Sequence, residues 1–481
     1  MEMSKNKSQN YVLHYASFFF FGSMSPNKPV ENLSVLNKRV IIVFVLDSIK
    51  LSGDRCVNAL KEYFRKLPRV LKETILLEIL ELMPLNSYSK WIANCIFEFC
   101  CSKFDVRSIS PKFHEKFVTN LQNVYYLNLT GAQITEQTLR NSIKKSPSLR
   151  ALIIPNLATD DVLKDIANLS NLELLNISGQ MSISEKGLQY LKSESLRILT
   201  AGNCTKHILL NYERDDEILA KILHQLPNLT EIRQYDLTGK SFLKLKSPYV
   251  SKLKSICDCK TTVRQLEAIM SICPELEELS LEDPEQAAVE LLNEFIKLKK
   301  LKITQFTHHE TGLNLKLSKL TLETLELKYL SINFNAICLT LEELLIRSCM
   351  ISTTSLLDVN FRNFRVIELI DSDVKKELIL ILFEQCNQLQ RIVMSNDIGL
   401  NDQDIIKLCE KRKLQQLEEM WLSIARQLTS ESVVMLMYHC DKLTLLGTLN
   451  GWNIEKIEVN YLRCVICLTN KNLNLLYFNC F

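Results

Sequence analysis

The side chains of this 481-residue chain that could do chemistry are chiefly its 16 cysteines and seven histidines. Cys464 and Cys467 form a Cys-x-x-Cys pair, which is half of a structural zinc site. Such a site needs four ligands, and only Cys480 lies nearby. The apolar residues between the two cysteines are typical of a buried strand or helix, so we expect no zinc here.

Two other groups of reactive side chains are not expected to bind a metal ion or to form a disulfide. His308 and His309 follow a predicted strand and are expected in a solvated loop. Cys257 and Cys259 alternate along a predicted strand, which places both thiols on one face about 7 Å apart, too far for an unstrained disulfide. The sequence has no Gly-rich phosphate loop, His-Glu-x-x-His helix or Gly-x-Ser-x-Gly elbow. We therefore expect no catalytic residues, no metal and no cofactor, and a binding role in place of an enzymatic one.

The element that organises these residues is a short leucine-rich phrase that recurs along the chain. Its copies begin at residues 121, 149, 172, 196, 229, 253, 276, 298, 322, 341, 364, 389, 417 and 443. The steps between them run from 19 residues (322 to 341) to 33 residues (196 to 229). This period is typical of a leucine-rich-repeat solenoid, in which each repeat is a strand followed by a helix. The predicted fold is therefore an α/β horseshoe with a parallel concave sheet and outer helices.

Within each repeat, the sequence predicts where the helix begins and what fills the core. Candidate N-cap residues are Thr135, Asp160, Ser184, Asn401 and Thr429. Several cysteines stand where a repeat needs a small buried residue, namely Cys204, Cys273, Cys349, Cys386, Cys409 and Cys440. The longest step contains the polar run NYERDDE, which we expect to form an exposed loop.

The pattern divides the chain into four parts. Residues 1–38 are expected to form a poorly ordered lead, although residues 11–21 also resemble the apolar part of a signal segment, and the sequence leaves this open. Residues 39–118 show helical periodicity and are expected to form a small all-helical block that caps the solenoid. Residues 119–449 form the solenoid, and residues 450–481 its C-terminal cap.

Strand alternation predicts which side chains face the concave surface. The candidates for contact with a bound protein are Tyr126, Asn128, Glu278, Lys300, Lys302, Glu326, Arg391, Glu419 and Trp421. Lys300 and Lys302 would form a local positive patch, and Trp421 is the candidate aromatic anchor. Acidic and basic residues are otherwise mixed, and the net charge is only +3, so we expect neither nucleic acid nor a membrane as partner. Free cysteines without a cystine cap favour a cytoplasmic or nuclear location.

The helical block and the repeats together resemble a known family. Repeats that begin CPELEEL, CNQLQRI and HCDKLTL resemble the cysteine-containing repeats of F-box proteins. The run from Leu71 to Pro84 follows the F-box pattern, with Lys72 where Pro is expected and Met83 where Leu is common. The resemblance implies a receptor subunit of a cullin-based (SCF-type) ubiquitin ligase, whose F-box docks an adaptor and whose solenoid holds a protein substrate. It assigns adaptor contacts to Leu71, Ile75, Leu76, Ile79, Leu82, Met83 and Pro84.

A second resemblance fits the same block. Leu67-Pro68-x-x-Leu71-x-x-x-Ile75 matches the cullin-contacting half of a VHL-box, which recruits elongin BC. Cys56 and Leu60 fit the other half, but Ser52 stands where that box has Leu. A third interpretation is that the apolar helical stripe Leu71, Ile75, Ile79 and Leu82 only caps the solenoid. The protein would then be a scaffold or inhibitor with no link to a ligase. All three place an apolar helical stripe against a groove or a neighbouring repeat.

Overall fold

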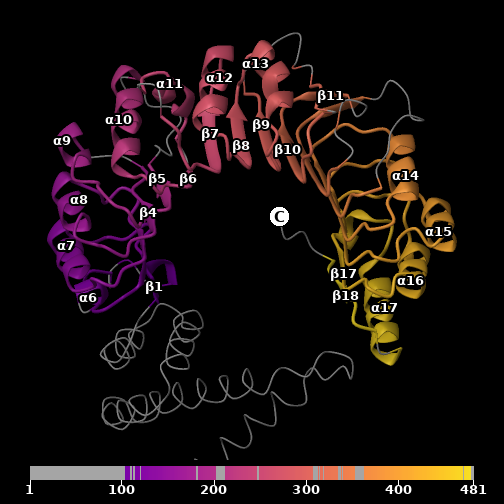
Figure 1. Ribbon diagram of the computed structural model, residues 1–481. Helices are drawn as coiled ribbons and strands as arrows, with labels where there is room; N and C mark the ends of the chain where they lie inside the picture. Colours follow the sequence, from indigo (N-terminus) through magenta and orange to yellow (C-terminus); the bar gives the residue numbers. More distant parts are fainter. Residues whose placement is uncertain are drawn as a thin grey trace, which may run out of the picture. The chain divides into compact units, whose positions relative to one another are not determined.

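The structure is a computed structural model, and it describes most of residues 103–477 (Figure 1). The gaps are residues 109–110, 112–113, 120, 180–182, 202–211, 234, 246–248, 307–312, 314, 318, 334–336, 338–339, 353–361 and 470. The predicted lead, most of the helical block and all seven predicted adaptor contacts lie outside the described residues. The chain divides into two compact units, Met1–Tyr235 and Asp236–Phe481, which we describe separately.

Every leucine-rich phrase contains a strand. The strand begins two residues after the first residue of the phrase in thirteen of the fourteen copies, because the phrase supplies the alternating apolar side chains that a half-buried strand needs. In unit 1 the strands pair in parallel and in chain order from β1 to β6. Their bounds are β1 Lys103–Asp105, β2 Tyr126–Asn128, β3 Ala151–Ile153, β4 Leu174–Asn176, β5 Ile198–Thr200 and β6 Glu231–Arg233.

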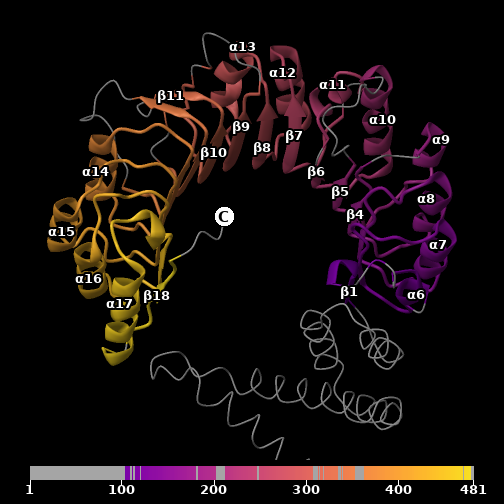
Figure 2. The same ribbon diagram turned by 180° about the vertical axis from the view of Figure 1, so that it is seen from behind.

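The helices of unit 1 cover one face of this sheet and leave the other, here called the open face, to solvent (Figures 1 and 2). They are α6 His114–Thr119, α7 Glu136–Lys144, α8 Asp160–Ile166, α9 Glu185–Leu188 and α10 Tyr212–Gln225, with the 3₁₀ turn η3 at Val106–Ser108. The predicted N-caps Thr135 and Ser184 are confirmed. Thr159, one residue before the predicted Asp160, caps α8. Asp160 instead accepts hydrogen bonds from the backbone and hydroxyl of Ser184 and so links one repeat to the next.

Unit 2 repeats the same plan, with a sheet ordered β7-β8-β9-β10-β12-β14-β15-β16-β17-β18. These strands are β7 Ser255–Cys259, β8 Glu278–Glu282, β9 Lys300–Thr304, β10 Thr324–Lys328, β12 Glu343–Arg347, β14 Val366–Ile370, β15 Arg391–Met394, β16 Glu419–Leu422, β17 Leu445–Gly447 and β18 Asn474–Leu475. The helices are α11 Thr238–Phe242, α12 Val263–Ile272, α13 Gln286–Glu290, α14 Lys376–Gln385, α15 Asp402–Glu410, α16 Ser430–His439 and α17 Lys456–Leu468, with 3₁₀ turns η5 Leu291–Glu294 and η7 Leu449–Gly451. Asn401 and Thr429 cap α15 and α16 as predicted.

The core of each unit lies between its sheet and its helices. The first residue of every phrase is buried, as are the inward strand positions such as Leu127, Leu279 and Leu325. Five of the six cysteines predicted as small core residues are buried, and Cys204 lies outside the described residues. The leucine-rich-repeat fold predicted from the sequence is therefore confirmed. Among the described helices, none combines the length and hydrophobicity needed to cross a bilayer.

Three local expectations are wrong. Residues 212–217 of the polar run form the first part of α10 and not a loop. Residues 103–105, placed in the all-helical block, form strand β1, because Phe104 and Val106 alternate with polar residues and are buried. Directly after β10 and β12 the chain forms short paired strands, β11 (Ser331–Asn333) and β13 (Met350–Ser352), which the plan of one strand and one helix per repeat did not include. Residues 334–336, 338–339 and 353–361, which follow these strands, lie outside the described residues.

Candidate functional site

A row of four apolar side chains crosses the open face of unit 1. Tyr126 lies beside Ala151, Ala151 beside Leu174, and Leu174 beside Ile198, each on the next strand of the sheet. All four are half-exposed. We call these four residues the unit 1 apolar row. Neighbouring parallel strands are about 4.8 Å apart, so the row is about 14 Å long, which suits a helix or an extended segment of another protein.

Charged groups stand at both ends of this row. Lys103 places its ammonium 4.8 Å from the centre of the Tyr126 ring. Glu231, next to Ile198, forms a 2.5 Å ion pair with Arg233 on its own strand. An apolar centre bordered by charged groups is the composition of protein-binding surfaces.

Asn128 does not have its predicted role on this face. Its side chain is only 4% exposed, although strand alternation places it outward. Its oxygen accepts hydrogen bonds from the backbone and hydroxyl of Thr130, and its amide donates to Asp105 at 3.0 Å. Asn176 accepts the same pair of bonds from Ser178. These asparagines turn the chain at the strand ends, and the expectation that Asn128 contacts a partner is corrected.

In unit 2, the open face carries pairs of opposite charges on neighbouring strands. The Lys300 ammonium lies 2.9 Å from the Glu278 carboxylate, and this contact raises the pKa of Lys300. Glu326 lies 3.4 Å from Lys302 and 2.8 Å from Lys328. Burial alone would raise the pKa of Glu326, but the two ammonium groups hold it below its usual value. Lys300 and Lys302 are therefore paired with carboxylates and do not form the predicted positive patch.

The charge pairs continue around a buried carboxylate. Glu368 points to the open face but is only 7% exposed, because Arg391 lies 2.7 Å and Arg347 3.4 Å from its oxygens. Arg391 also lies 3.2 Å from Glu419 on the next strand. Of the predicted contact residues, Arg391 and Glu419 thus belong to one charged network across four strands, β12, β14, β15 and β16.

Next to this network lies the predicted anchor, Trp421. It is half-exposed, and its in-register neighbours are Val393 and Gly447. A Cβ atom at Gly447 would lie 2.0 Å from an atom of the indole ring, so the ring occupies the space that a side chain at this position would need. Half-exposed Leu345 lies on the far side of Glu368 in the same register. Trp421 and Leu345 thus offer apolar contacts beside the Arg391 network.

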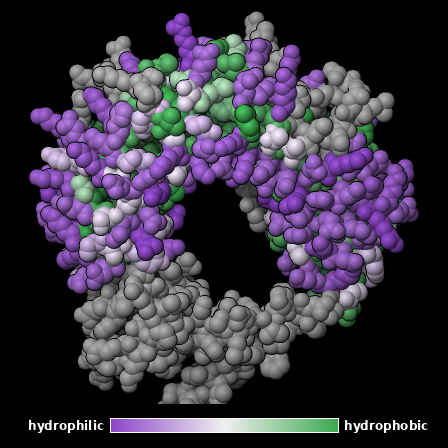
Figure 3. Space-filling model, in the orientation of Figure 1, coloured by the Kyte–Doolittle hydropathy of each residue, from purple (hydrophilic) through white to green (hydrophobic). Residues whose placement is uncertain are grey.

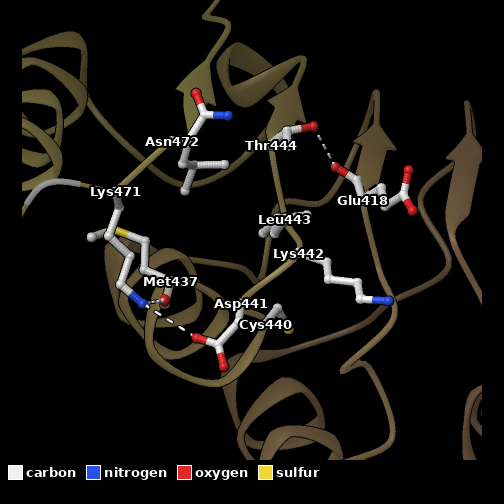
Figure 4. A pocket seen from close by; sticks show the side chains of 10 residues that line it. Glu418, Met437, Cys440, Asp441, Lys442, Leu443, Thr444, Lys471 and Asn472 are labelled. Carbon is white, nitrogen blue, oxygen red and sulfur yellow. Dashed lines mark hydrogen bonds and ion pairs between the residues drawn. The ribbon is translucent and has the colours of Figure 1, made fainter. Parts of the chain in front are cut away.

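A depression of about 360 Å³ lies nearby, where α16 ends and β17 begins (Figure 4). Lys471 points into it and donates a 2.8 Å hydrogen bond to the carbonyl of Met437, and its ammonium lies 3.7 Å from Asp441. A cation near the C-terminal carbonyls of a helix stabilises that helix. The arrangement caps α16, and we assign no ligand to it.

Among the residues that the structure describes, the other groups singled out in the sequence form no metal site. Cys464 and Cys467 lie on α17 with both thiols exposed, contrary to the expected burial. Cys257 and Cys259 lie half-exposed on one face of β7, as predicted. Within the described ranges, no three His, Cys, Asp or Glu residues are close enough to hold a metal ion. The His308-His309 pair lies outside these ranges.

The sequence reasoning missed the unit 1 apolar row, apart from Tyr126. The signal was present, because Ala151, Leu174 and Ile198 occupy the same strand position as Tyr126 in successive phrases. The contact between Trp421 and Gly447 had no comparable signal, since it joins residues of two different repeats.

The repeats and the open faces define a leucine-rich-repeat solenoid with the surface features of a binding protein. Neither a family model nor a curated protein sequence matches the chain. Among solved structures, the chain is similar to a chain of the TLR13–ssRNA13 complex, at 15% identity and a TM-score of 0.42, covering 79% of this chain and 52% of that one. The chain thus spans about half the length of that structure.

Two further solved structures show lower similarity. The structure of the Rad7 and Elc1 complex in yeast matches at 15% identity and a TM-score of 0.32, covering 93% of both chains. A protein from Bacteroides fragilis matches at 13% identity and a TM-score of 0.25, covering 59% of this chain and 65% of that one.

Proposed function

We propose that this protein is a non-catalytic binding subunit that holds another protein on the open faces of its sheet. The observation that carries the proposal is the unit 1 apolar row, Tyr126, Ala151, Leu174 and Ile198, half-exposed and in register on four neighbouring strands. A contiguous apolar surface with a charged border is typical of a protein-interaction site.

The electrostatics of the open faces favour a protein partner over nucleic acid. Nucleic-acid binding depends on cations that are available to neutralise phosphates. On unit 2, the described cations Lys300, Lys302 and Lys328 each lie within 3.4 Å of a carboxylate. Arg347 and Arg391 share the Glu368 carboxylate. A phosphate backbone would have to displace these carboxylates, whereas a protein surface can complement both signs.

Within this role, we propose that the chain is a substrate receptor of a cullin-based ubiquitin ligase. Support comes from the sequence between Leu71 and Pro84, which follows the F-box pattern with two departures. Its apolar stripe, Leu71, Ile75, Ile79 and Leu82, has the spacing of a helix that lies in a partner's groove. The elongin-type receptor uses the same stripe and differs in the adaptor it recruits.

The open-face role is tested by truncating the candidate anchor. Trp421→Ala is expected to weaken capture of the bound protein about 30-fold, since an aromatic anchor contributes about 2 kcal/mol or more. Tyr438→Ala is the matched control, because Tyr438 is an exposed aromatic residue on α16, on the helix-covered side. Quantitative affinity purification of the full chain measures both. Equal recovery of every partner with the two variants would remove the anchor role, provided that both melt like the wild type.

The ligase role is tested separately, with a triple substitution of Ile75, Ile79 and Leu82 by Asp. Loss of the F-box adaptor, with the open-face partner still bound, supports the SCF-type role, and loss of elongin supports the alternative. If the wild-type chain captures neither adaptor, the ligase proposal is wrong and the scaffold role remains. Melting of the variant must match the wild type, because a cap that packs on the first repeat would unfold with it.

A further inference from the structure

The outer surface of α17 carries an apolar stripe that the fold does not use. Ile457, Tyr461 and Leu468 are 73%, 70% and 85% exposed, and Cys464 is exposed between them. Hydrophobic atoms are visible at the lower end of α17 in Figure 3, below the largely hydrophilic surface of the neighbouring repeats. We call these four residues the α17 stripe.

The α17 stripe lies opposite the side of the helix that joins the core. Val459, Leu462 and Ile466 are the buried residues of α17, and at 100° per residue they lie about 160° around the helix from the stripe. Other outer helices carry polar residues in the equivalent place: Gln403, Lys407 and Glu410 on α15, and Arg264, Glu267 and Ser271 on α12. Outward apolar residues on a solenoid helix need a partner, because such surfaces reduce solubility.

We propose that the α17 stripe is a self-association surface, on which α17 of a second copy of this chain packs in the antiparallel direction. The stripe residues are spaced four, three and four apart, which is the seam of a helix pair. In an antiparallel pair, Ile457 of one copy lies beside Leu468 of the other, and Tyr461 beside Cys464. The same stripe on the two copies can therefore form the whole contact under twofold symmetry.

The charged residues of α17 lie off the seam. At 100° per residue, Lys456, Glu458 and Arg463 lie roughly 90° to 130° around the helix from the centre of the stripe, and Arg463 donates a hydrogen bond to the carbonyl of Leu475. The seam itself is therefore uncharged, and the antiparallel direction is favoured by the helix dipoles, which then point in opposite directions.

The size of the stripe sets the strength of the dimer. Four side chains of this kind expose on the order of 500 Å², comparable to the largest apolar patch of an ordinary monomer. Two copies would bury about 1,000 Å², the lower limit for a specific interface. The association is therefore expected to be reversible and dependent on concentration.

Sedimentation of the full chain over a range of concentrations tests the proposal. The wild type is expected to shift from monomer to dimer, and Leu468→Glu to weaken the dimer at least tenfold. Gln403→Glu places the same charge on the exposed outer side of α15 and is expected to leave the dimer unchanged. A wild type that stays monomeric throughout, or a dimer that persists in Leu468→Glu, would overturn the proposal. Because Leu468 is already exposed, its replacement should not alter melting.

A covalent test identifies the neighbour of Tyr461. Tyr461→Cys is expected to form a disulfide-linked dimer under mild oxidation, by pairing with Cys464 of the second copy. The double variant Tyr461→Cys and Cys464→Ser is expected to lose this link. A link that persists in the double variant would contradict the antiparallel arrangement, since parallel helices bring the two introduced thiols together. If no link forms in the single variant, a second copy does not occupy the stripe.

Discussion

Asp258 occupies a position on β7 where a leucine-rich repeat normally places an apolar side chain. It is only 1% exposed. Its carboxylate accepts hydrogen bonds from the backbone of Gly239 at 2.9 Å and from the Thr261 hydroxyl at 2.8 Å. The Gly239 amide lies in the first turn of α11, whose N-cap, Leu237, has no side chain that could accept it. Asp258 therefore caps a helix from the neighbouring element, and this is the physical reason for a polar residue in the core.

Asp258 makes unit 2 less stable at high pH. Burial raises its pKa from 3.8 to about 6, although its hydrogen bonds offset part of this effect. The folded chain thus binds this proton more tightly than the unfolded chain. The resulting stabilisation is complete below about pH 4 and is lost as the pH rises through 6, a change on the order of 3 kcal/mol. Asp258→Asn keeps an acceptor for Gly239 and is expected to remove this pH dependence and to raise stability at pH 8.

Urea unfolding midpoints at pH 4.5 and pH 8 measure this effect. The control is Asp441→Asn, because the Asp441 side chain is 90% exposed and its loss should leave the wild-type profile unchanged. If Asp258→Asn and the wild type lose stability in parallel between the two pH values, the account of Asp258 is wrong.

At the scale of single residues, strand alternation predicted correctly that Tyr126, Glu278 and Trp421 are accessible on the open face. It failed at Asn128, because an amide next to a strand end bonds to the chain that turns there. It also failed for the positive patch at Lys300 and Lys302, because their partners Glu278 and Glu326 lie on neighbouring strands, 22 and 24 residues away in the sequence. Side-chain pairing between repeats depends on register, which composition does not reveal.

At the scale of elements, the leucine phrase was sufficient to locate the strands, because its alternation specifies both a strand and the face that it buries. Polar caps located the starts of four helices for a similar local reason. The phrase could not locate β1, β11, β13 and β18, which lie outside it. Nor could it show that α10 includes the polar run, since a helix whose sequence is charged at its start looks like a loop.

The register of the strands predicts a sharp difference between neighbouring residues on β8. Leu279 is 2% exposed in the core, whereas Ser280, the next residue, is half-exposed on the open face. Leu279→Asp is expected to cost several kcal/mol, because it buries a charge without a partner. Ser280→Asp is the matched control and is expected to change stability by less than about 0.5 kcal/mol. Thermal unfolding compares them, and equal melting of the two variants would refute the register.

At the scale of the whole molecule, repeats of one plan build two units whose open faces differ in character. Unit 1 offers the apolar row, and unit 2 offers paired charges next to Trp421. The sequence was sufficient to predict the solenoid, whereas the binding role remains a prediction. It could not identify the partner, because the contact residues vary from repeat to repeat and follow no motif. The adaptor contacts from Leu71 to Pro84 remain a prediction.

Site-specific photocrosslinking tests the central claim most directly. A photoreactive residue is introduced in the full chain either at Leu174, in the unit 1 apolar row, or at Lys164, which is exposed on α8 on the opposite side of the same unit. We expect a discrete protein adduct from position 174 and none from position 164. An adduct from position 164 alone, or the absence of any adduct from position 174 under conditions where the chain captures its partner, would contradict the account.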